Sequence, residues 1–292
     1  MKTAFASIAA LTVAAAAFGE GYAPEKWNLE AREKFAAQRF GIFIHWGIYA
    51  NYAQGEWYLH NGGKPLNEAA YSRMKDGFFP SKFDAKEWVR VFKDAGAKYV
   101  TITSRHHDGF SMWPTKADDG YNIANTPFRR DILGELSKAC DEAGLQLNFY
   151  YSLMDWHRKD YPPGDRAGKH NLPGRNPDYA SYKAFMLAQI GELIDSYHPG
   201  NIWFDGEWEH AKRQKDGTWK RTLDWDFDTI YDFIHSRHVL VANNNHQPIR
   251  DKEDIQLFER DLPGEGSMFS KDQPLTRDRP VEQCDVIQHN VW

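Results

Sequence analysis

The sequence predicts an α/β fold arranged as a (β/α)8-type, TIM-like barrel. Short apolar or β-branched segments alternate with amphipathic helical segments, and this order predicts a parallel sheet with crossover helices. Most strand segments are continuously apolar, as in strands buried on both faces. The first strand is followed by His45-Trp46-Gly47 and not by a glycine-rich phosphate loop, which favours a barrel over an open doubly wound sheet.

Seven strands are expected, at residues 40–45, 99–103, 145–152, 201–205, 239–243, 255–258 and 285–288. Between them, apolar residues recur at helical spacing after Asp84, from Leu133, from Met186 and from Phe227. Asp84 and Glu87 have the spacing of an N-cap and its partner. Residues 161–178 and the polar insert at 210–220 read as loops that could rim a pocket.

The N-terminal segment and the two cysteines indicate where the protein is located. Lys2 followed by a small and apolar stretch over residues 4–18 predicts a signal peptide at 1–19, too short to span a bilayer. We therefore expect a secreted or periplasmic protein with no membrane span, whose catalytic domain covers residues 20–292. Cys140 lies on the apolar face of a predicted helix, which favours a buried free thiol, although an exported chain could pair it with Cys284.

Composition narrows the class of ligand. The formal net charge of -5, without a run of Lys or Arg, argues against a nucleic-acid partner. The aromatic content of 15% suits stacking on sugar rings but is equally compatible with a tryptophan-rich core.

Polar and aromatic side chains follow the predicted strand ends, which converge on one mouth in a barrel. They are His45-Trp46, His106-His107-Asp108, Tyr150-Tyr151, Asp205 with Glu207, Trp208 and Glu209, Asn243-Asn244-Asn245-His246, Glu259 with Asp261, and His289-Asn290. Amides and imidazoles bind hydroxyls, aromatic rings bind sugar faces, and paired carboxylates can cleave a glycosidic bond. The sequence thus predicts a site for a polyhydroxylated ligand.

Two of these segments leave alternatives open. Asp205 ends a buried apolar strand, where a carboxylate can be catalytic or can serve as a helix N-cap or ion-pair partner. His106 and His107 are adjacent, so they point to opposite faces of a strand and are poorly placed to share a metal. Metal-site motifs such as His-Glu-x-x-His are absent, so we expect hydroxyl binding and neither a metal nor another cofactor, with structural hydrogen bonding as the alternative.

Several longer segments together resemble glycoside hydrolase family 29, the α-L-fucosidases, over roughly residues 25 to 292. They are residues 39–47 (RFGIFIHWG), 55–58 (GEWY), 98–100 (KYV), 106–110 (HHDGF), 113–116 (WPTK), 129–131 (RRD), 150–153 (YYSL), 203–206 (WFDG), 258–265 (FERDLPGE) and 282–284 (EQC). The HHDGF and WFDG segments, in this order and spacing, are the most specific.

This resemblance implies a retaining double displacement on terminal α-L-fucosyl linkages of glycans, with Asp205 as nucleophile. It assigns the grip on fucose to His45, Glu56, Trp57, His106, His107 and Tyr151, with Trp203 at the floor of the site. The acid/base varies within the family. Glu259 is the first candidate, Glu265 the second and Glu282 the third.

The chain departs from the family in two places. Many members carry Asn-Asp-Arg after the fifth strand, where this chain reads Asn243-Asn244-Asn245-His246. Members also continue through a closing strand and helix and usually a β-sandwich, so we expect a barrel truncated after the seventh strand. The alternatives are therefore a weakly active or non-catalytic fucose-binding relative and, from another class, a barrel hydrolase with different sugar or metal chemistry. Linkage specificity, possible homo-oligomers and the choice among the three glutamates stay open.

Overall fold

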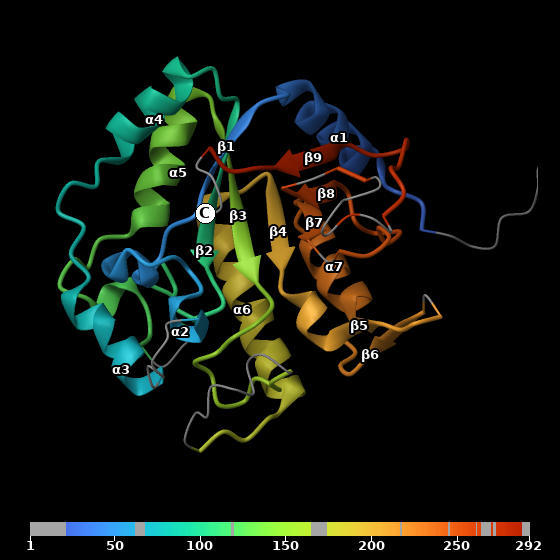
Figure 1. Cartoon of the computed structure of the whole chain (residues 1–292). Helices are drawn as coiled ribbons and strands as arrows, with labels where there is room; N and C mark the ends of the chain where they lie inside the picture. The colour runs from blue at the N-terminus through green and yellow to red at the C-terminus, as the bar shows by residue number, and fades with distance from the viewer. Residues whose placement is uncertain are drawn as a thin grey trace, which may run out of the picture.

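The fold is α/β with a mostly parallel sheet (Figure 1). The computed structural model describes residues 22–61, 68–117, 120–164, 174–216, 218–244, 246–260, 262–263, 270 and 273–287. Five parallel strands pair in the order β1 (Gly41–Ile44), β2 (Tyr99–Arg105), β3 (Gln146–Ser152), β4 (Asn201–Asp205) and β7 (Leu240–Asn244). A parallel pair, β8 (Gln256–Glu259) and β9 (Val281–Cys284), is connected to β7 by a bridge between Ala242 and Ile255.

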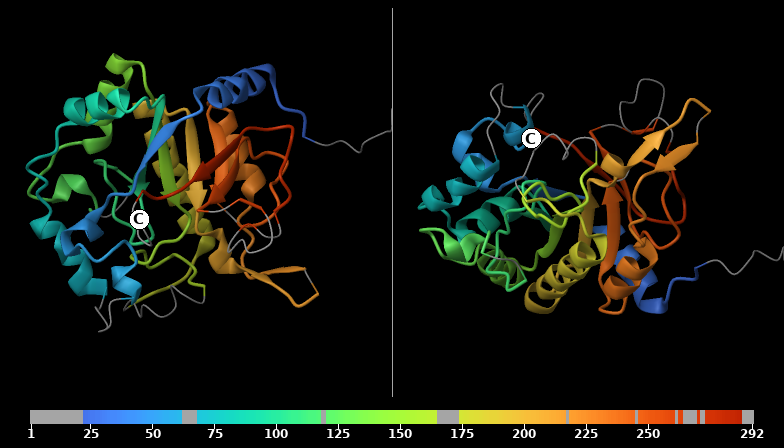
Figure 2. Two further views of the ribbon diagram at one scale, coloured as in Figure 1. Left: turned by 45° about the horizontal axis from the view of Figure 1, so that its top comes forward. Right: turned by 90° about the horizontal axis from the view of Figure 1, so that it is seen from below.

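Four amphipathic helices cover the outer face of the sheet: α4 (Ala85–Asp94), α5 (Ile132–Ala143), α6 (Tyr179–Tyr197) and α7 (Phe227–His235) (Figures 1 and 2). Asp84 caps α4 by accepting a 3.0 Å hydrogen bond from the Glu87 backbone N–H, as its spacing predicted. Short helical turns occupy the loops: η1 (Ile48–Tyr52), α2 (Tyr58–Asn61), α3 (Glu68–Ser72), η2 (Arg73–Gly77), η3 (Ile123–Asn125) and η5 (Glu207–His210).

The sheet curls strongly. The rings of Phe43 on β1 and Trp203 on β4 have centroids 5.4 Å apart, although three strand spacings of a flat sheet would separate them by about 14 Å. Farther round, the Tyr99 hydroxyl on β2 donates a 2.9 Å hydrogen bond to Glu282 on β9. Over the described residues β9 pairs only with β8 and β1 only with β2, so a closed barrel stays a prediction.

The curled sheet separates two cores. Alternate strand residues such as Val100, Phe149 and Phe204 pack outward against the helices. The intervening residues, among them Tyr150 and Trp203, pack inside the curl. This alternation decides which side chains can reach an interior site.

Three expectations need correction. The seventh strand lies at Val281–Cys284 and the described residues 285–287 are not in a strand, because the inward-facing Glu282 breaks the apolar pattern by which strands were predicted. The insert predicted as loop contains a hairpin of β5 (Ala211–Arg213) and β6 (Trp219–Arg221). Helix α1 (Lys26–Gln38) was not predicted, because its buried face carries polar residues, of which Arg32 donates to Asp254.

Helix α1 lies at the end of the sheet where the strands begin (Figure 1). There Phe35 packs on Tyr99, with ring centroids 5.2 Å apart. The opposite end, where the strands end, is left for the site. Cys140 and Cys284 are both buried and unpaired, as expected for Cys140. The predicted signal peptide lies outside the described residues, and none of the described helices is long and apolar enough to cross a bilayer.

Candidate active site

Asp205, the last residue of β4, is held by donors from three elements. Its Oδ2 accepts a 2.8 Å hydrogen bond from the Tyr150 hydroxyl, and its Oδ1 accepts bonds from Trp208 Nε1 (3.1 Å) and Asn244 Nδ2 (3.3 Å). His107 Nε2 lies 3.5 Å from Oδ2. A carboxylate in this cage has a fixed orientation and little contact with water.

Glu259, the last residue of β8, is the carboxylate paired with Asp205. Asn244 Nδ2 also donates to Glu259 Oε2 (2.6 Å), so one amide bridges the two groups, and His246 Nε2 lies 3.4 Å from the same oxygen. Burial, followed by the nearby Glu259 carboxylate, raises the pKa of Asp205 to about 6. Burial acts to raise the pKa of Glu259 too, but hydrogen bonds from His246 and Asn244 outweigh it and lower that pKa.

The three predicted histidines lie together beside this pair. The rings of His45 and His106 are 4.6 Å apart, and those of His106 and His107 are 3.9 Å apart. His45 Nδ1 is 2.5 Å from the Tyr49 hydroxyl, and His107 Nδ1 is 2.7 Å from Ser152 Oγ. Burial lowers the pKa of His45 to about 3 and, with the neighbouring imidazoles, that of His106 well below its ordinary range. Neutral imidazoles can donate to or accept from sugar hydroxyls.

Glu56 and Trp57 approach the same site from the loop after η1. The Trp57 ring packs on His107 (5.1 Å) and on Trp208 (5.8 Å), which bonds Asp205. Burial, together with the Glu259 carboxylate, raises the pKa of Glu56. Both residues are therefore neighbours of the carboxylate pair, and their contact with fucose stays a prediction. Across the described ranges, no group of three or more His, Cys, Asp or Glu side chains has a metal-binding arrangement.

Two predicted site residues, Tyr151 and Glu282, have hydrogen-bond partners other than Asp205 and Glu259. Tyr151 points outward, where its hydroxyl donates to Gln189 on α6 (2.8 Å) and its ring lies beneath the Arg105 guanidinium, so its expected contact with fucose is wrong. Glu282 on β9 faces the interior, where it accepts a 2.9 Å hydrogen bond from the Tyr99 hydroxyl and also lies beside Trp203, so its candidacy as acid/base stays a prediction. Glu265 lies outside the described residues.

Tyr150 takes the inward position that was assigned to Tyr151. It shares a face with Ser152 on β3, and the strand register aligns Ser152 with Asp205 and Tyr150 with Trp203. Side chains alternate between the two faces of a strand, so the residues of β3 that align with the inward-facing Trp203 and Asp205 also face inward. This rule selects Tyr150 and not Tyr151. Trp203 stacks against Tyr150 with centroids 5.4 Å apart, one layer below Asp205, and its place at the floor of a fucose site stays a prediction.

Asn244 and His246 entered the sequence reading as polar residues after a predicted strand and as a departure from a family pattern, but without an assigned role in the site. Asn244 occupies the position where β7 aligns with Asp205 of β4, so the register explains the amide bridge. Only the three-dimensional path of the following loop brings His246 to Glu259.

Comparison with known proteins agrees with the geometry. The profile of the family described as Alpha-L-fucosidase matches residues 9–292. The chain belongs to the α-L-fucosidase family. It is 32% identical over 229 residues to an α-L-fucosidase of Dictyostelium discoideum, covering 70% of this chain and 47% of that protein. It is 30% identical over 205 residues to human tissue α-L-fucosidase, covering 64% and 42% respectively.

Solved α-L-fucosidase structures superpose on the same region. Isoenzyme 1 from Paenibacillus thiaminolyticus has a TM-score of 0.71 and 30% identity, covering 89% of this chain and 61% of its own. A trapped covalent intermediate of the Bacteroides thetaiotaomicron α-L-fucosidase has a TM-score of 0.65 at 28% identity, covering 85% and 58%. The chain thus spans about half the length of its curated fucosidase relatives.

Proposed function

We propose that the chain is a retaining α-L-fucosidase that hydrolyses terminal α-L-fucosyl linkages of glycans. The observation that carries this proposal is the amide bridge from Asn244. Hydrogen bonds of 3.3 Å and 2.6 Å from one nitrogen keep the bonded oxygens of Asp205 and Glu259 less than about 6 Å apart. Retaining glycosidases need about 5–5.5 Å between the carboxyl groups, whereas inverting enzymes need about 6.5–9.5 Å to admit a water.

In the first proposed step an oxygen of Asp205 bonds to the anomeric carbon while the bond from that carbon to the leaving oxygen breaks. Glu259 gives its proton to the leaving oxygen. In the second step Glu259 takes a proton from water, whose oxygen bonds to the anomeric carbon as the ester bond to Asp205 breaks. The two inversions at carbon give net retention, and Glu259 ends protonated again, because the proton that left with the aglycone is replaced by one from water.

This chemistry requires a particular protonation state of the two carboxylates. The first step needs an ionised Asp205 and a proton on Glu259, whereas in the free protein burial raises the pKa of Asp205 and hydrogen bonds from His246 and Asn244 lower that of Glu259. Positive charge that develops at the anomeric carbon favours ionised Asp205, so substrate binding would shift the proton toward Glu259. His45, His106, His107, Glu56 and Trp57 are proposed to hold fucose above the pair.

The assignment of Asp205 is tested with an aryl α-L-fucoside. Asp205→Ala should abolish turnover, and added azide should restore it with β-fucosyl azide as the product, because azide enters from the vacated face. Asp205→Asn, which keeps the shape, should be equally inactive without azide. Full activity in either variant would refute the assignment.

A second candidate function is fucose binding with little or no turnover. The departure of residues 243–246 from the Asn-Asp-Arg segment of many family members favours it. Titration calorimetry with L-fucose separates the two: binding without hydrolysis of the aryl fucoside from pH 4 to 8 would support the binding protein.

Export through residues 1–19 is proposed as well, with a fucosylated glycan outside the cytoplasm as the partner. N-terminal sequencing of mature protein from the native host should give a start near residue 20. A start at Met1 would contradict export by a cleaved signal.

A further inference from the structure

The carboxylate of Glu207 is buried, charged and two residues beyond Asp205, yet the proposed mechanism does not use it. Its side chain is 1% exposed. Its oxygens accept hydrogen bonds from Asn243 Nδ2 (3.2 Å), Gln247 Nε2 (3.4 Å) and the Arg250 guanidinium. Burying a carboxylate is costly unless it is paired and hydrogen-bonded, so this arrangement has a structural purpose.

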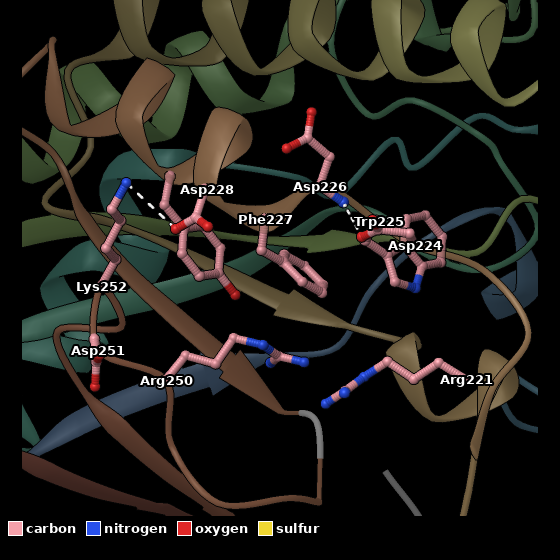
Figure 3. A pocket seen from close by; sticks show the side chains of 10 residues that line it. Arg221, Asp224, Trp225, Asp226, Phe227, Asp228, Arg250, Asp251 and Lys252 are labelled. Carbon is pink, nitrogen blue, oxygen red and sulfur yellow. Dashed lines mark hydrogen bonds and ion pairs between the residues drawn. The ribbon is translucent and has the colours of Figure 1, made fainter. Parts of the chain in front are cut away.

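Arg250 is itself fixed in place. Its Nη1 donates to Glu253 Oε1 (3.0 Å), and its guanidinium carbon lies 4.4 Å from the centroid of the Phe227 ring at the start of α7. Arg250 and Arg221 line a cleft of about 510 Å³. They extend toward each other from opposite sides of this cleft, with Phe227 above the Arg250 head group (Figure 3).

Arg221 is the weaker partner of Glu207. Its Nε lies 3.8 Å from Glu207 Oε1, and half of its side chain is exposed, whereas Arg250 is 23% exposed. Because solvent screens exposed pairs, the contact with Arg250 should dominate.

Two short paths connect Glu207 to the catalytic pair, one along the backbone and one through hydrogen bonds of adjacent asparagines. On β4 the path is Asp205-Gly206-Glu207, and Gly206 has φ +99°, with Met154 Cγ only 2.9 Å from where a Cβ would stand. This turn therefore has little freedom to absorb a shift. On β7, Asn243 bonds Glu207 while the next residue, Asn244, bridges Asp205 and Glu259.

We propose that the Arg250–Glu207 ion pair is a positioning device for both catalytic carboxylates, which rests on the function proposed above. Glu207 ties the end of β4 to the end of β7, and Arg250 supplies the charge that keeps Glu207 in its buried place. Without Arg250, the buried Glu207 carboxylate loses its charged partner, and its side chain should move toward water. Movement would carry Trp208, and with it a hydrogen bond to Asp205, out of position.

The test uses Arg250→Met, Glu207→Gln and the double variant on an aryl α-L-fucoside. Each single variant should lower kcat roughly 10- to 100-fold, as expected for a small misplacement of reacting groups, while KM changes less than about 3-fold. The double variant should be no slower than the slower single variant, because both changes break one interaction.

Arg250→Lys should recover part of kcat. Lys252→Met is the matched control: Lys252 lines the same cleft but pairs with Asp228 and Asp232, and its kcat should match the wild type.

Folded variants with kcat within 2-fold of the wild type would overturn the proposal, and so would losses that multiply in the double variant. Circular dichroism establishes folding in each case. A second measurement, of inhibitor affinity, tests the proposal even if the wild-type protein shows no turnover of the aryl fucoside. A fucose-configured iminocyclitol carries a cation that would pair with Asp205, so its calorimetric affinity should fall about 10-fold in Arg250→Met and Glu207→Gln and stay unchanged in Lys252→Met. Equal affinity in all variants refutes the positioning role independently of the hydrolytic function.

Discussion

Replacing Glu282 by Gln should stabilise the protein above neutral pH. Burial raises the pKa of Glu282 from 4.5 to about 7, against the opposing effect of the hydrogen bond from Tyr99. Between these values the folded protein keeps a proton that the unfolded chain releases. Stability from this group is therefore complete below pH 4.5 and is lost as pH rises to 7.

The size of the effect follows from the two pKa values. At about 1.4 kcal/mol for each pKa unit, ionised Glu282 costs the folded state about 3 kcal/mol. Gln has the same shape, can still accept from Tyr99 and never ionises. The variant should therefore exceed the wild type by up to about 3 kcal/mol at pH 8 and match it near pH 4.5.

Urea unfolding followed by tryptophan fluorescence at pH 4.5, 6 and 8 measures this difference. Glu30→Gln on α1 is a suitable control, because Glu30 is exposed and pairs only loosely with Lys26 at 3.4 Å. A difference between Glu282→Gln and the wild type that does not change with pH would refute the reasoning. Glu282→Gln should also keep kcat within about 2-fold, because the Asn244 amide bridges Asp205 to Glu259 and not to Glu282; a large loss would favour Glu282 as the acid/base.

Three further predictions concern the chemistry. Tyr150→Phe removes a 2.8 Å hydrogen bond to Asp205 and should lower kcat roughly 10-fold on an aryl α-L-fucoside, whereas Tyr151→Phe should be nearly silent; the reverse order would contradict the assigned strand faces. Glu259→Gln should lower kcat/KM roughly 100-fold or more on fucosides with poor leaving groups but little on fucosides with good leaving groups. Azide should speed turnover of the fucosides with good leaving groups. Equal losses on both kinds of substrate would point to another acid. Prolonged chelation should leave activity unchanged, and a loss restored by a divalent cation would favour a metal-dependent hydrolase.

The fold could largely be predicted from the sequence because most of its strands are buried on both faces. Continuous apolar segments, such as the one ending at Asp205, have no polar alternation to confuse them with surface strands. The prediction failed where buried polar groups pair with each other. Arg32 on α1 is buried against Asp254, and Glu282 on β9 against Tyr99, so neither element shows an apolar pattern.

The site divides along a similar line. The motifs predicted that Asp205, His106 and His107 lie at strand ends. Asp205 ends β4, and the two histidines follow the end of β2. Contacts that depend on loop paths could not be predicted. The distance of 43 residues between Glu207 and Arg250 leaves no periodic or spacing signal in the sequence.

The central claim is that Asp205 forms a covalent bond to the substrate. The most direct measurement is mass spectrometry of the protein after reaction with 2-fluoro-fucosyl fluoride, which forms the glycosyl-enzyme quickly and releases it slowly. We predict one added fluorofucosyl group per chain, located by peptide fragmentation on Asp205 and absent from Asp205→Asn. A label on another carboxylate, or inverted configuration of the released fucose with no label, would contradict the account.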